Sequence, residues 1–372
     1  MAQLTRLTSP DGRGPRAGFR SPAKVAVIDI GSHSIHMVIA KIRDQRFKIT
    51  SRIREPVGLG YGTLVEGRLS PSVMAAGMDA LAGMIEIATR EGVDAILPVA
   101  TSAIREAVNG AEFIRRARVE LGLVVEVISG DEEARLIFRA VSQAMDIRNQ
   151  RVLVADIGGG SVELVQALGS KIEWQTSLKL GAVRMTEHFI ESDPPEPMEI
   201  CALRSYVDRR LRPFALRAAA HRPAMMIATS GTFRSLAAMA HAKRTGESPR
   251  QLHGQTLGRR ELTVLRAALC GQTAGERERT SGLSPRRAGV IVAGALLAEA
   301  LMDSFGQRVV RLSDWALREG VILEFMELSR AAQDSELHRA SPDGRSPGPR
   351  RHRRPRSAGR RGAAHNNRPT AR

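Results

Sequence analysis

One sixteen-residue pattern occurs twice in the chain, and it limits the possible folds more than any other feature. The two stretches are VAVIDIGSHSIHMVIA at 25–40 and VLVADIGGGSVELVQA at 152–167. Aligned without gaps they share eight of sixteen residues, at an offset of 127 positions. Each consists of a β-branched apolar run, an acid followed by glycine, and a second apolar run, which is typical of two strands joined by a tight turn. The composition favours strands buried on both faces, as in α/β proteins.

The segments around the two copies alternate between strand and helix patterns. A helix is expected from Pro71 with Ser70 as its N-cap, and strand–helix units are expected at 95–121, 124–145, 225–240 and 308–322. A length of 372 residues suits about two domains. We therefore expect an N-terminal domain over 25–145 and a C-terminal domain over 146–330.

The net charge of +17 is concentrated at the two ends of the chain. The segment 339–372 has eleven Arg and one Asp, a net +10, and 1–24 carries +4, which leaves +3 for the remainder. Both ends are rich in Arg, Pro and Gly, so we expect disordered basic segments at 1–24 and 331–372. The tail could make nonspecific contact with a polyanion such as RNA or polyphosphate, or it could be a solvated segment with no ligand of its own.

The remaining composition suggests a cytoplasmic protein without a membrane segment. Cys201 and Cys270 are far apart, which disfavours a disulfide framework or a thiolate zinc site. The apolar run at 290–302 is too short for a membrane span, which needs about 20 residues. The first 24 residues lack the apolar core of a secretory signal.

The two turns are candidate phosphate sites. Small residues after a strand allow backbone N–H groups to converge on an anion, because no side chain blocks the approach. The acids that precede the turns, Asp29 and Asp156, would repel phosphate unless a cation lay between them. Mg²⁺ prefers one or two carboxylates together with phosphate oxygens and water. One such turn could be a simple hairpin, but two matched turns with the acid in register favour a phosphate site.

Seven motifs, in this order, resemble the exopolyphosphatase/guanosine pentaphosphate phosphohydrolase (Ppx/GppA) family. They are GSHSIHMVIA (31–40), ATSAIREAVNG (100–110), EVISGDEEARLIF (126–138), DIGGGSVEL (156–164), LGAVRMTE (180–187), TSGTFRSLA (229–237) and LSDWALREG (312–320). The resemblance covers roughly 25–325. It implies an α/β fold of two RNase H-like domains, the actin/sugar-kinase/Hsp70 superfold, with the active site in the cleft between them. It also implies Mg²⁺-dependent hydrolysis of a terminal phosphoanhydride, and a homodimer is possible.

The resemblance identifies Glu133, the second glutamate of the SGDEEAR stretch, as the catalytic base. A carboxylate at a helix start facing the turns can orient the attacking water and accept its proton. Adjacent helix residues point about 100° apart, so only Glu133 or Glu132 can face the cleft. Without the motif, two acids in a first helical turn would be an ordinary helix-dipole feature.

The other candidate residues fall into two groups. Glu163, in an apolar strand where a lone carboxylate would be costly, joins two acids as metal-associated residues: Asp29, Asp156 and Glu163. The phosphate-binding candidates lie in three small-residue turns and one helix start: Ser32, His33, Ser34, Arg105, Gly158, Gly159, Gly160, Ser161, Ser230, Gly231 and Thr232. Arg105 could equally be a solvated arginine at the start of a helix, without a role in phosphate binding.

Three features depart from the family pattern. The first loop usually reads GSNS, whereas here His33 replaces the asparagine. An imidazole with a pKa near ~6.5 would gain charge in mild acid, which predicts higher activity there, although a neutral replacement is an equal alternative. The LGYG stretch at 59–62 lacks the arginine expected before it, and we expect no HD-like helical region after the core.

Two substrates and two other functions stay open at this point. The motifs suit release of orthophosphate from polyphosphate, and they suit equally the 5′-phosphohydrolysis of guanosine pentaphosphate (pppGpp). A kinase of the same superfold is disfavoured, since its adenosine turn is usually richer in glycine than TSGTF. A non-catalytic polyanion-binding regulator would bind RNA through the tail and release no phosphate.

Overall fold

The structure is a computed structural model that describes residues 23–249 and 251–340. Most of the two segments expected to be disordered, 1–24 and 331–372, lies outside these residues. The helix that begins at Leu317 continues to Ala340, past the boundary expected at 330. Its last part is rich in Ala, Leu, Glu and Arg, which have high helix propensity.

The N-terminal half is built on a five-stranded sheet in the order β3-β2-β1-β4-β5. β1 pairs antiparallel with β2 and parallel with β4, and β2 pairs antiparallel with β3. The bounds are Ala23–Ile30 (β1), Ile35–Arg43 (β2), Arg46–Glu55 (β3), Ala95–Ala100 (β4) and Glu126–Val127 (β5).

The C-terminal half repeats this arrangement in a six-stranded sheet, in the order β10-β11-β9-β6-β7-β8. β6 pairs antiparallel with β7 and parallel with β9. In the two hairpins Asp29 lies opposite His36 and Asp156 lies opposite Glu163, so the sequence repeat is a structural repeat in the same register. The bounds are Arg151–Ile157 (β6), Val162–Leu168 (β7), Lys171–Leu178 (β8), Met225–Thr229 (β9), Thr256–Gly258 (β10) and Val309–Leu312 (β11). The expected two-domain α/β fold is confirmed.

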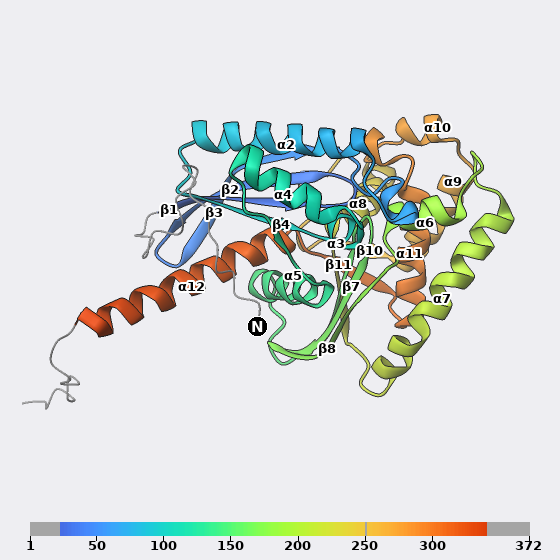
Figure 1. Ribbon diagram of the computed structural model, residues 1–372. Helices are drawn as coiled ribbons and strands as arrows, with labels where there is room; N and C mark the ends of the chain where they lie inside the picture. Colours follow the sequence, from blue (N-terminus) through green and yellow to red (C-terminus); the bar gives the residue numbers. More distant parts are fainter. Residues whose placement is uncertain (1–22, 250, 341–372) are drawn as a thin grey trace, which may run out of the picture.

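Two helices, α5 (Gly130–Ala144) and α12 (Leu317–Ala340), fill the space between the two sheets. Apolar residues of both helices form one buried cluster with the inward faces of β1 and β6. The helices cross at Gly320, where any Cβ would collide with the backbone carbonyl of Leu136. α12 belongs to the C-terminal half by sequence, yet it packs against β1, β2 and α5 (Figure 1).

The outer face of the first sheet is covered by α2 (Pro71–Arg90) and α4 (Gly110–Leu121), which run along the top of Figure 1. Ser70 caps α2 as expected, since its side chain accepts a hydrogen bond from the Val73 N–H. By length and composition alone, α2 is the one helix in the described part of the chain that could cross a membrane. Its buried side packs into the cluster formed with β1 and β2, as in an amphipathic helix over a sheet.

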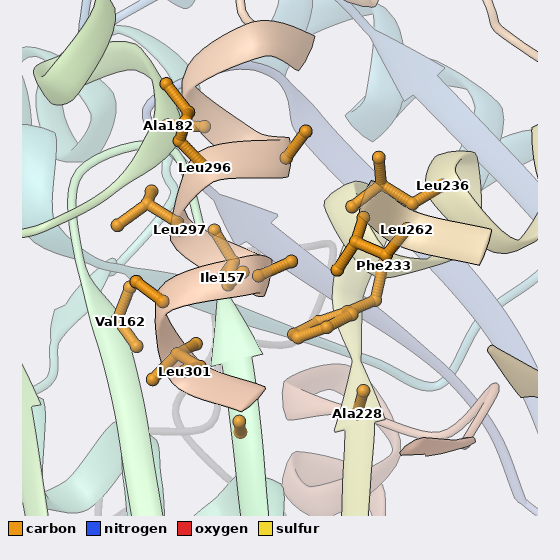
Figure 2. Packing of buried hydrophobic residues seen from close by; sticks show 14 of the residues in the cluster. Ile157, Val162, Ala182, Ala228, Phe233, Leu236, Leu262, Leu296, Leu297 and Leu301 are labelled. Atoms are coloured by element: carbon orange, nitrogen blue, oxygen red, sulfur yellow. The ribbon is translucent and has the colours of Figure 1, made fainter. Parts of the chain in front are cut away.

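The apolar run that follows residue 290 forms α11 (Ile291–Ser304), and all its residues from Ile291 to Met302 are buried. Leu296, Leu297 and Leu301 point into a cluster with Phe233 and Val162, which is seen in Figure 2. The remaining helices are α1 (Thr63–Glu66), α3 (Ser102–Glu106), α6 (Ala182–Phe189), α7 (Pro197–Ala219), α8 (Ser230–Thr245), α9 (Arg259–Cys270), α10 (Ala274–Glu278) and the 3₁₀ turn η1 (Pro285–Arg287).

Candidate active site

The repeated hairpin turns lie side by side in the lining of one cleft of about 650 Å³. The turn after β1 spans 31–34 and the turn after β6 spans 158–161. They touch directly, because Cβ atoms added at Gly159 or Gly160 would press on the side chain of Ser32. This contact explains why small residues occur at these positions in both turns.

Glu133 enters the cleft from the first turn of α5. Ser129 caps this helix by accepting a hydrogen bond from the Glu132 N–H. Glu133 is buried and lines the cleft, while Glu132 turns away and forms an ion pair with Arg135. The expectation that only one of the two glutamates faces the cleft is therefore confirmed.

Arg105 lies beside Glu133 rather than in the wall of the cleft. Its Nη1 is 3.3 Å from Glu133 Oε2 and donates a hydrogen bond to the Ile128 carbonyl at 2.8 Å. Arg105 thus has two partners that hold it against the glutamate. The structure gives it a role in orienting Glu133, which the sequence did not suggest.

Four carboxylates of this region influence one another's pKa: Asp29, Glu133, Asp156 and Glu163. Burial, and then the charge of Glu163, raises the pKa of Glu133 well above its ordinary value, against the effect of Arg105. Burial and Glu163 also raise the pKa of Asp156, to about 8. Burial raises the pKa of Asp29, although its ion pair with Arg318, 3.2 Å long, opposes the rise.

Glu163 sits behind the cleft wall, where Ser177 donates a hydrogen bond to it at 2.7 Å. Burial raises the pKa of Glu163, and the hydroxyls of Ser161 and Ser177 oppose the rise. Two serine hydroxyls thus offset the cost of this carboxylate in an apolar strand, where the sequence predicted a metal-associated acid. Gly160 also faces away from the cleft, and its carbonyl accepts a hydrogen bond from Arg184 at 2.9 Å.

The acidic group has the donor chemistry that Mg²⁺ prefers. Within the described residues no three acids, histidines or cysteines are close enough to hold a metal unaided. Mg²⁺ does not need such a cage, since it keeps several waters and uses one or two carboxylates with phosphate oxygens. Asp29 and Asp156 both line the cleft, and burial raises the pKa of each carboxyl group, so they fit this mode.

The third small turn, at the start of α8, also reaches the cleft. Ser230 has a left-handed φ of 77°, an uncommon conformation for a residue with a side chain. The hydroxyls of Ser230 and Thr232 both donate to the Ile157 carbonyl, at 2.8 and 3.1 Å. This pair ties the third turn to the second, and the backbone of Gly231 faces Arg287.

The cleft also contains an arginine cluster that sequence reasoning missed, formed by Arg52, Arg54, Arg234, Arg287 and Arg318. Arg287 makes no ion pair with any described residue, and its guanidinium packs on Gly231. Burial and the charge of Arg54 lower its pKa to about 10, which leaves it charged at neutral pH. Five arginines beside phosphate-type turns, of which Arg54 and Arg287 make no ion pair with a described residue, indicate an anion site.

His33 lines the cleft, but its charge differs from the expectation. Burial, Arg287 and Arg54 lower its pKa to about 4. The imidazole is therefore neutral in mild acid, and the predicted rise in activity there is wrong for this cause. The sequence shows the histidine but not the two arginines that come to it from other elements.

Most of the site residues predicted from the sequence thus line the same cleft. Those that line the cleft are Asp29, Ser32, His33, Ser34, Glu133, Asp156, Gly158, Gly159, Ser161, Ser230, Gly231 and Thr232. Arg105, Gly160 and Glu163 lie directly behind them.

The sequence matches the model of the Ppx/GppA phosphatase family over residues 38–329. The chain belongs to the Ppx/GppA phosphatase family. Exopolyphosphatase 1 of Mycobacterium leprae is 33% identical over 306 residues, which cover 82% of this chain and 90% of that protein. Its counterpart in Mycobacterium tuberculosis is 34% identical over 310 residues, 82% of this chain and 88% of that protein.

Solved structures of Ppx/GppA proteins have the same fold. An exopolyphosphatase from Cytophaga hutchinsonii superposes with a TM-score of 0.77 at 30% identity, over 82% of this chain and 98% of that one. A Ppx/GppA protein from Aquifex aeolicus gives a TM-score of 0.69 at 30% identity, with the same coverage. The family assignment expected from the seven motifs is confirmed, and the chain is an enzyme of this phosphatase family.

Proposed function

We propose that the protein is a Mg²⁺-dependent exopolyphosphatase that releases orthophosphate from the ends of inorganic polyphosphate. One observation carries this proposal: a single cleft has a buried glutamate with other acids at one part and a cluster of arginines at another. A polyphosphate chain is negatively charged along its whole length. Its terminal phosphate would lie by Glu133 and the two turns, and the following phosphates would contact Arg54, Arg234 and Arg287.

The residues suggest how hydrolysis would proceed. Glu133 orients a water molecule and accepts its proton as the water oxygen attacks the terminal phosphorus. The bond from that phosphorus to the bridging oxygen breaks, so orthophosphate and a chain one phosphate shorter are formed. Backbone N–H groups of the turns at 31–34 and 158–161 stabilise the charge that develops on the phosphoryl oxygens. The raised pKa of Glu133 suits a group that must accept a proton near neutral pH.

Asp29 and Asp156 would hold the Mg²⁺ ion, which would neutralise charge on the phosphoryl oxygens when bound. Arg318, which forms an ion pair with Asp29, lines the same cleft and would add positive charge beside the phosphates of the substrate.

The homologues named exopolyphosphatase support polyphosphate as the substrate. The same groups could hydrolyse the 5′-terminal phosphate of pppGpp, and no observation in the cleft favours that substrate over polyphosphate. The experiment that tests the proposal therefore includes pppGpp as a second substrate.

Orthophosphate release should be measured with long polyphosphate, tripolyphosphate, pppGpp and ATP, with Mg²⁺ and with EDTA. We expect release from polyphosphate that requires Mg²⁺ and is largely lost in Glu133→Gln, while this variant still binds the substrate. Release from pppGpp alone would assign the alternative activity. Binding without release from any substrate would instead make the protein a polyanion-binding regulator.

A further inference from the structure

The loop after β3 presents a tyrosine to the imidazole of His33. Tyr61 and His33 are joined by a hydrogen bond of 3.3 Å between the phenolic oxygen and Nδ1. Their rings meet edge to face, with centroids 6.1 Å apart. His33 lines the cleft, whereas Tyr61 does not. Tyr61 can therefore act on a ligand only through the histidine.

The other imidazole nitrogen has no partner. His33 Nε2 is buried and makes no hydrogen bond with any described residue. A buried polar atom without a partner carries a free-energy cost, so such an atom beside a binding cleft points to a polar group of a ligand as its partner. The neighbouring Ser32, Gly159 and Arg287 are all parts of the phosphate-type wall.

Backbone contacts fix the loop that bears Tyr61. The N–H groups of Gly58 and Gly60 donate to the carbonyls of His33 and Ser32, at 3.2 and 2.6 Å. The Tyr61 ring covers Gly58, whose φ of 72° and close contact with the ring exclude a side chain. Glu187 of α6 holds the end of the loop by accepting the Gly62 N–H at 2.6 Å. The phenol is thus set against the imidazole by the same contacts that shape the first phosphate turn.

The tautomer of His33 decides what the cleft presents to an anion. If Nδ1 carries the proton, it donates to Tyr61, and the Nε2 lone pair would repel a phosphate oxygen. If Tyr61 donates its O–H to Nδ1, then Nε2 carries the proton and becomes a neutral donor. Burial and Glu187 raise the pKa of Tyr61, which keeps the phenolic proton available for this bond.

We propose that Tyr61 is a positioning residue that holds His33 in the Nε2–H tautomer, so that the imidazole donates a hydrogen bond to a phosphate oxygen of the bound substrate. This inference rests on the proposed function for the identity of the substrate. His33 would then be a neutral hydrogen-bond donor among arginines. Such a donor recognises the position of a phosphate oxygen rather than the total charge of the ligand. The proposal also gives the departure from the GSNS pattern a role, since His33 needs a second residue to set its proton, whereas an asparagine amide does not.

Tyr61→Phe tests the proposal, because phenylalanine keeps the ring over Gly58 and removes only the hydroxyl. Tyr206→Phe is the matched control. Tyr206, in α7, is the only other tyrosine of the chain, and its ring packs against that of Phe189 with centroids 5.2 Å apart. Loss of one hydrogen bond to the positioned ring should raise KM for polyphosphate about three- to ten-fold with kcat changed less. Tyr206→Phe should leave both unchanged.

A double-mutant cycle separates positioning from a general structural effect. In a His33→Ala background, Tyr61→Phe should cause no further rise in KM, since the residue through which it acts is absent. An equal rise in both backgrounds would overturn the proposal. Unfolding temperatures of all variants identify any that fail to fold.

Nitrogen-15 shifts of the His33 ring give a readout that does not need turnover. They should be recorded for Glu133→Gln with tripolyphosphate bound, alone and combined with Tyr61→Phe. We expect protonated Nε2 and an Nδ1 that accepts a hydrogen bond, with a shift toward mixed tautomers in the double variant. An unprotonated Nε2 in the loaded protein overturns the proposal, whereas absence of phosphate release by the wild type would overturn only the proposed function.

Discussion

Arg184 and Glu106 form an ion pair across the two halves of the protein, with 2.9 Å between Nη2 and Oε1. Arg184 lies in α6 of the C-terminal half, and Glu106 ends α3 of the N-terminal half. The same guanidinium donates to the carbonyls of Gly160 and Leu64, at 2.9 and 3.1 Å. One buried side chain therefore holds the second phosphate turn to the opposite half.

Arg184→Met should weaken both the fold and the site. Methionine keeps an apolar stem but leaves two buried carbonyls without a donor, and Glu106 keeps only the exposed Lys179 as a partner. Removing one member of such a buried network typically costs about 3 kcal/mol of unfolding free energy. We expect a lower denaturation midpoint and a kcat reduced at least about ten-fold, because the turn at Gly160 loses its anchor.

Arg148→Met is the control for Arg184→Met. Arg148 forms an exposed ion pair with Asp146 on the loop before β6, and exposed pairs contribute little. Denaturation curves and phosphate release should both match the wild type. Equal stability of the two variants would show that the Arg184 network does not hold the two halves together.

The adjacent pair Glu132 and Glu133 provides a test of the catalytic base within one helical turn. Glu133→Gln removes the proton acceptor while keeping its shape, and should lower kcat by about 100-fold or more. Glu132→Gln changes the charge of the next residue, which binds Arg135 away from the cleft, and should change kcat less than about two-fold. Initial rates with Mg²⁺ and polyphosphate decide between them. Comparable losses in both variants would contradict the assignment of Glu133.

The phosphate turns and Glu133 could be predicted because each belongs to a continuous stretch of chain. The repeat at 25–40 and 152–167 contains its own strand, acid and turn, and helix geometry separates Glu133 from Glu132. The arginine cluster could not be found in this way, since its members come from β3, α8, η1 and the start of α12. A single arginine among 56 Lys and Arg residues carries no local signal, and only the fold brings these five together.

Contacts between segments that are distant in sequence also explain two other differences between the sequence-based predictions and the structure. The pKa of His33 depends on Arg54 and Arg287, which are distant in sequence, so its neutral state was not predictable from the turn itself. The position of α12 between the sheets depends on contacts with both halves. Its apolar pattern indicates a buried side, but not that this side meets β1 of the other half.

The buried acids of the cleft should make the metal-free protein less stable as the pH rises. The folded pKa of Asp156 is about 8, above its ordinary value of 3.8, so the folded state keeps a proton that the unfolded state releases. The contribution of this group is fully present below pH ~4 and is lost as the pH rises to about 8. Asp156→Asn removes this effect because an amide does not ionise.

In EDTA, the unfolding temperature of Asp156→Asn should exceed that of the wild type at pH 8, and the difference should shrink as the pH falls and vanish below pH ~4. Ser32→Ala, which alters the same wall without changing a titrating group, should shift the curve by a constant amount at all pH values. A wild-type stability that rises between pH 5 and 8 faster than that of Asp156→Asn would contradict the raised pKa.

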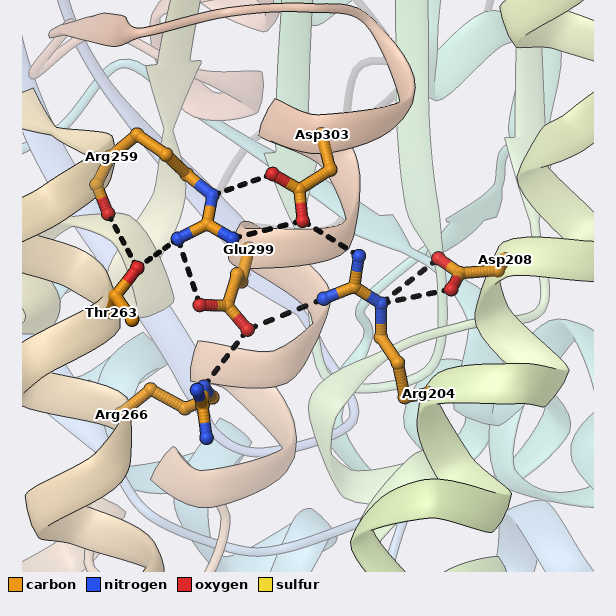
Figure 3. A network of polar contacts seen from close by, with 7 residues as sticks. All are labelled: Arg204, Asp208, Arg259, Thr263, Arg266, Glu299 and Asp303. Atoms are coloured by element: carbon orange, nitrogen blue, oxygen red, sulfur yellow. Dashed lines mark hydrogen bonds and ion pairs between the residues drawn. The ribbon is translucent and has the colours of Figure 1, made fainter.

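The ion-pair network around Glu299 should stabilise the C-terminal half without contributing to catalysis. Glu299 is buried in α11 and forms ion pairs with Arg204, Arg259 and Arg266, which lie in α7 and α9 (Figure 3). Asp303, one helical turn later, shares Arg204 and Arg259. Glu299→Ala leaves Arg266 without its ion pair and removes one of the carboxylates that neutralise Arg204 and Arg259, which should cost about 3 kcal/mol of unfolding free energy.

Because no member of this network lines the cleft, kcat and KM of Glu299→Ala should match the wild type at temperatures where it is folded. Glu278→Ala, an exposed glutamate of α10, is the control and should leave the denaturation midpoint unchanged. Urea denaturation and phosphate release measured on the same samples separate the two effects. A Glu299→Ala protein of normal stability would mean that the desolvation of Glu299 costs as much as its three arginines return, the balance often found for buried ion pairs.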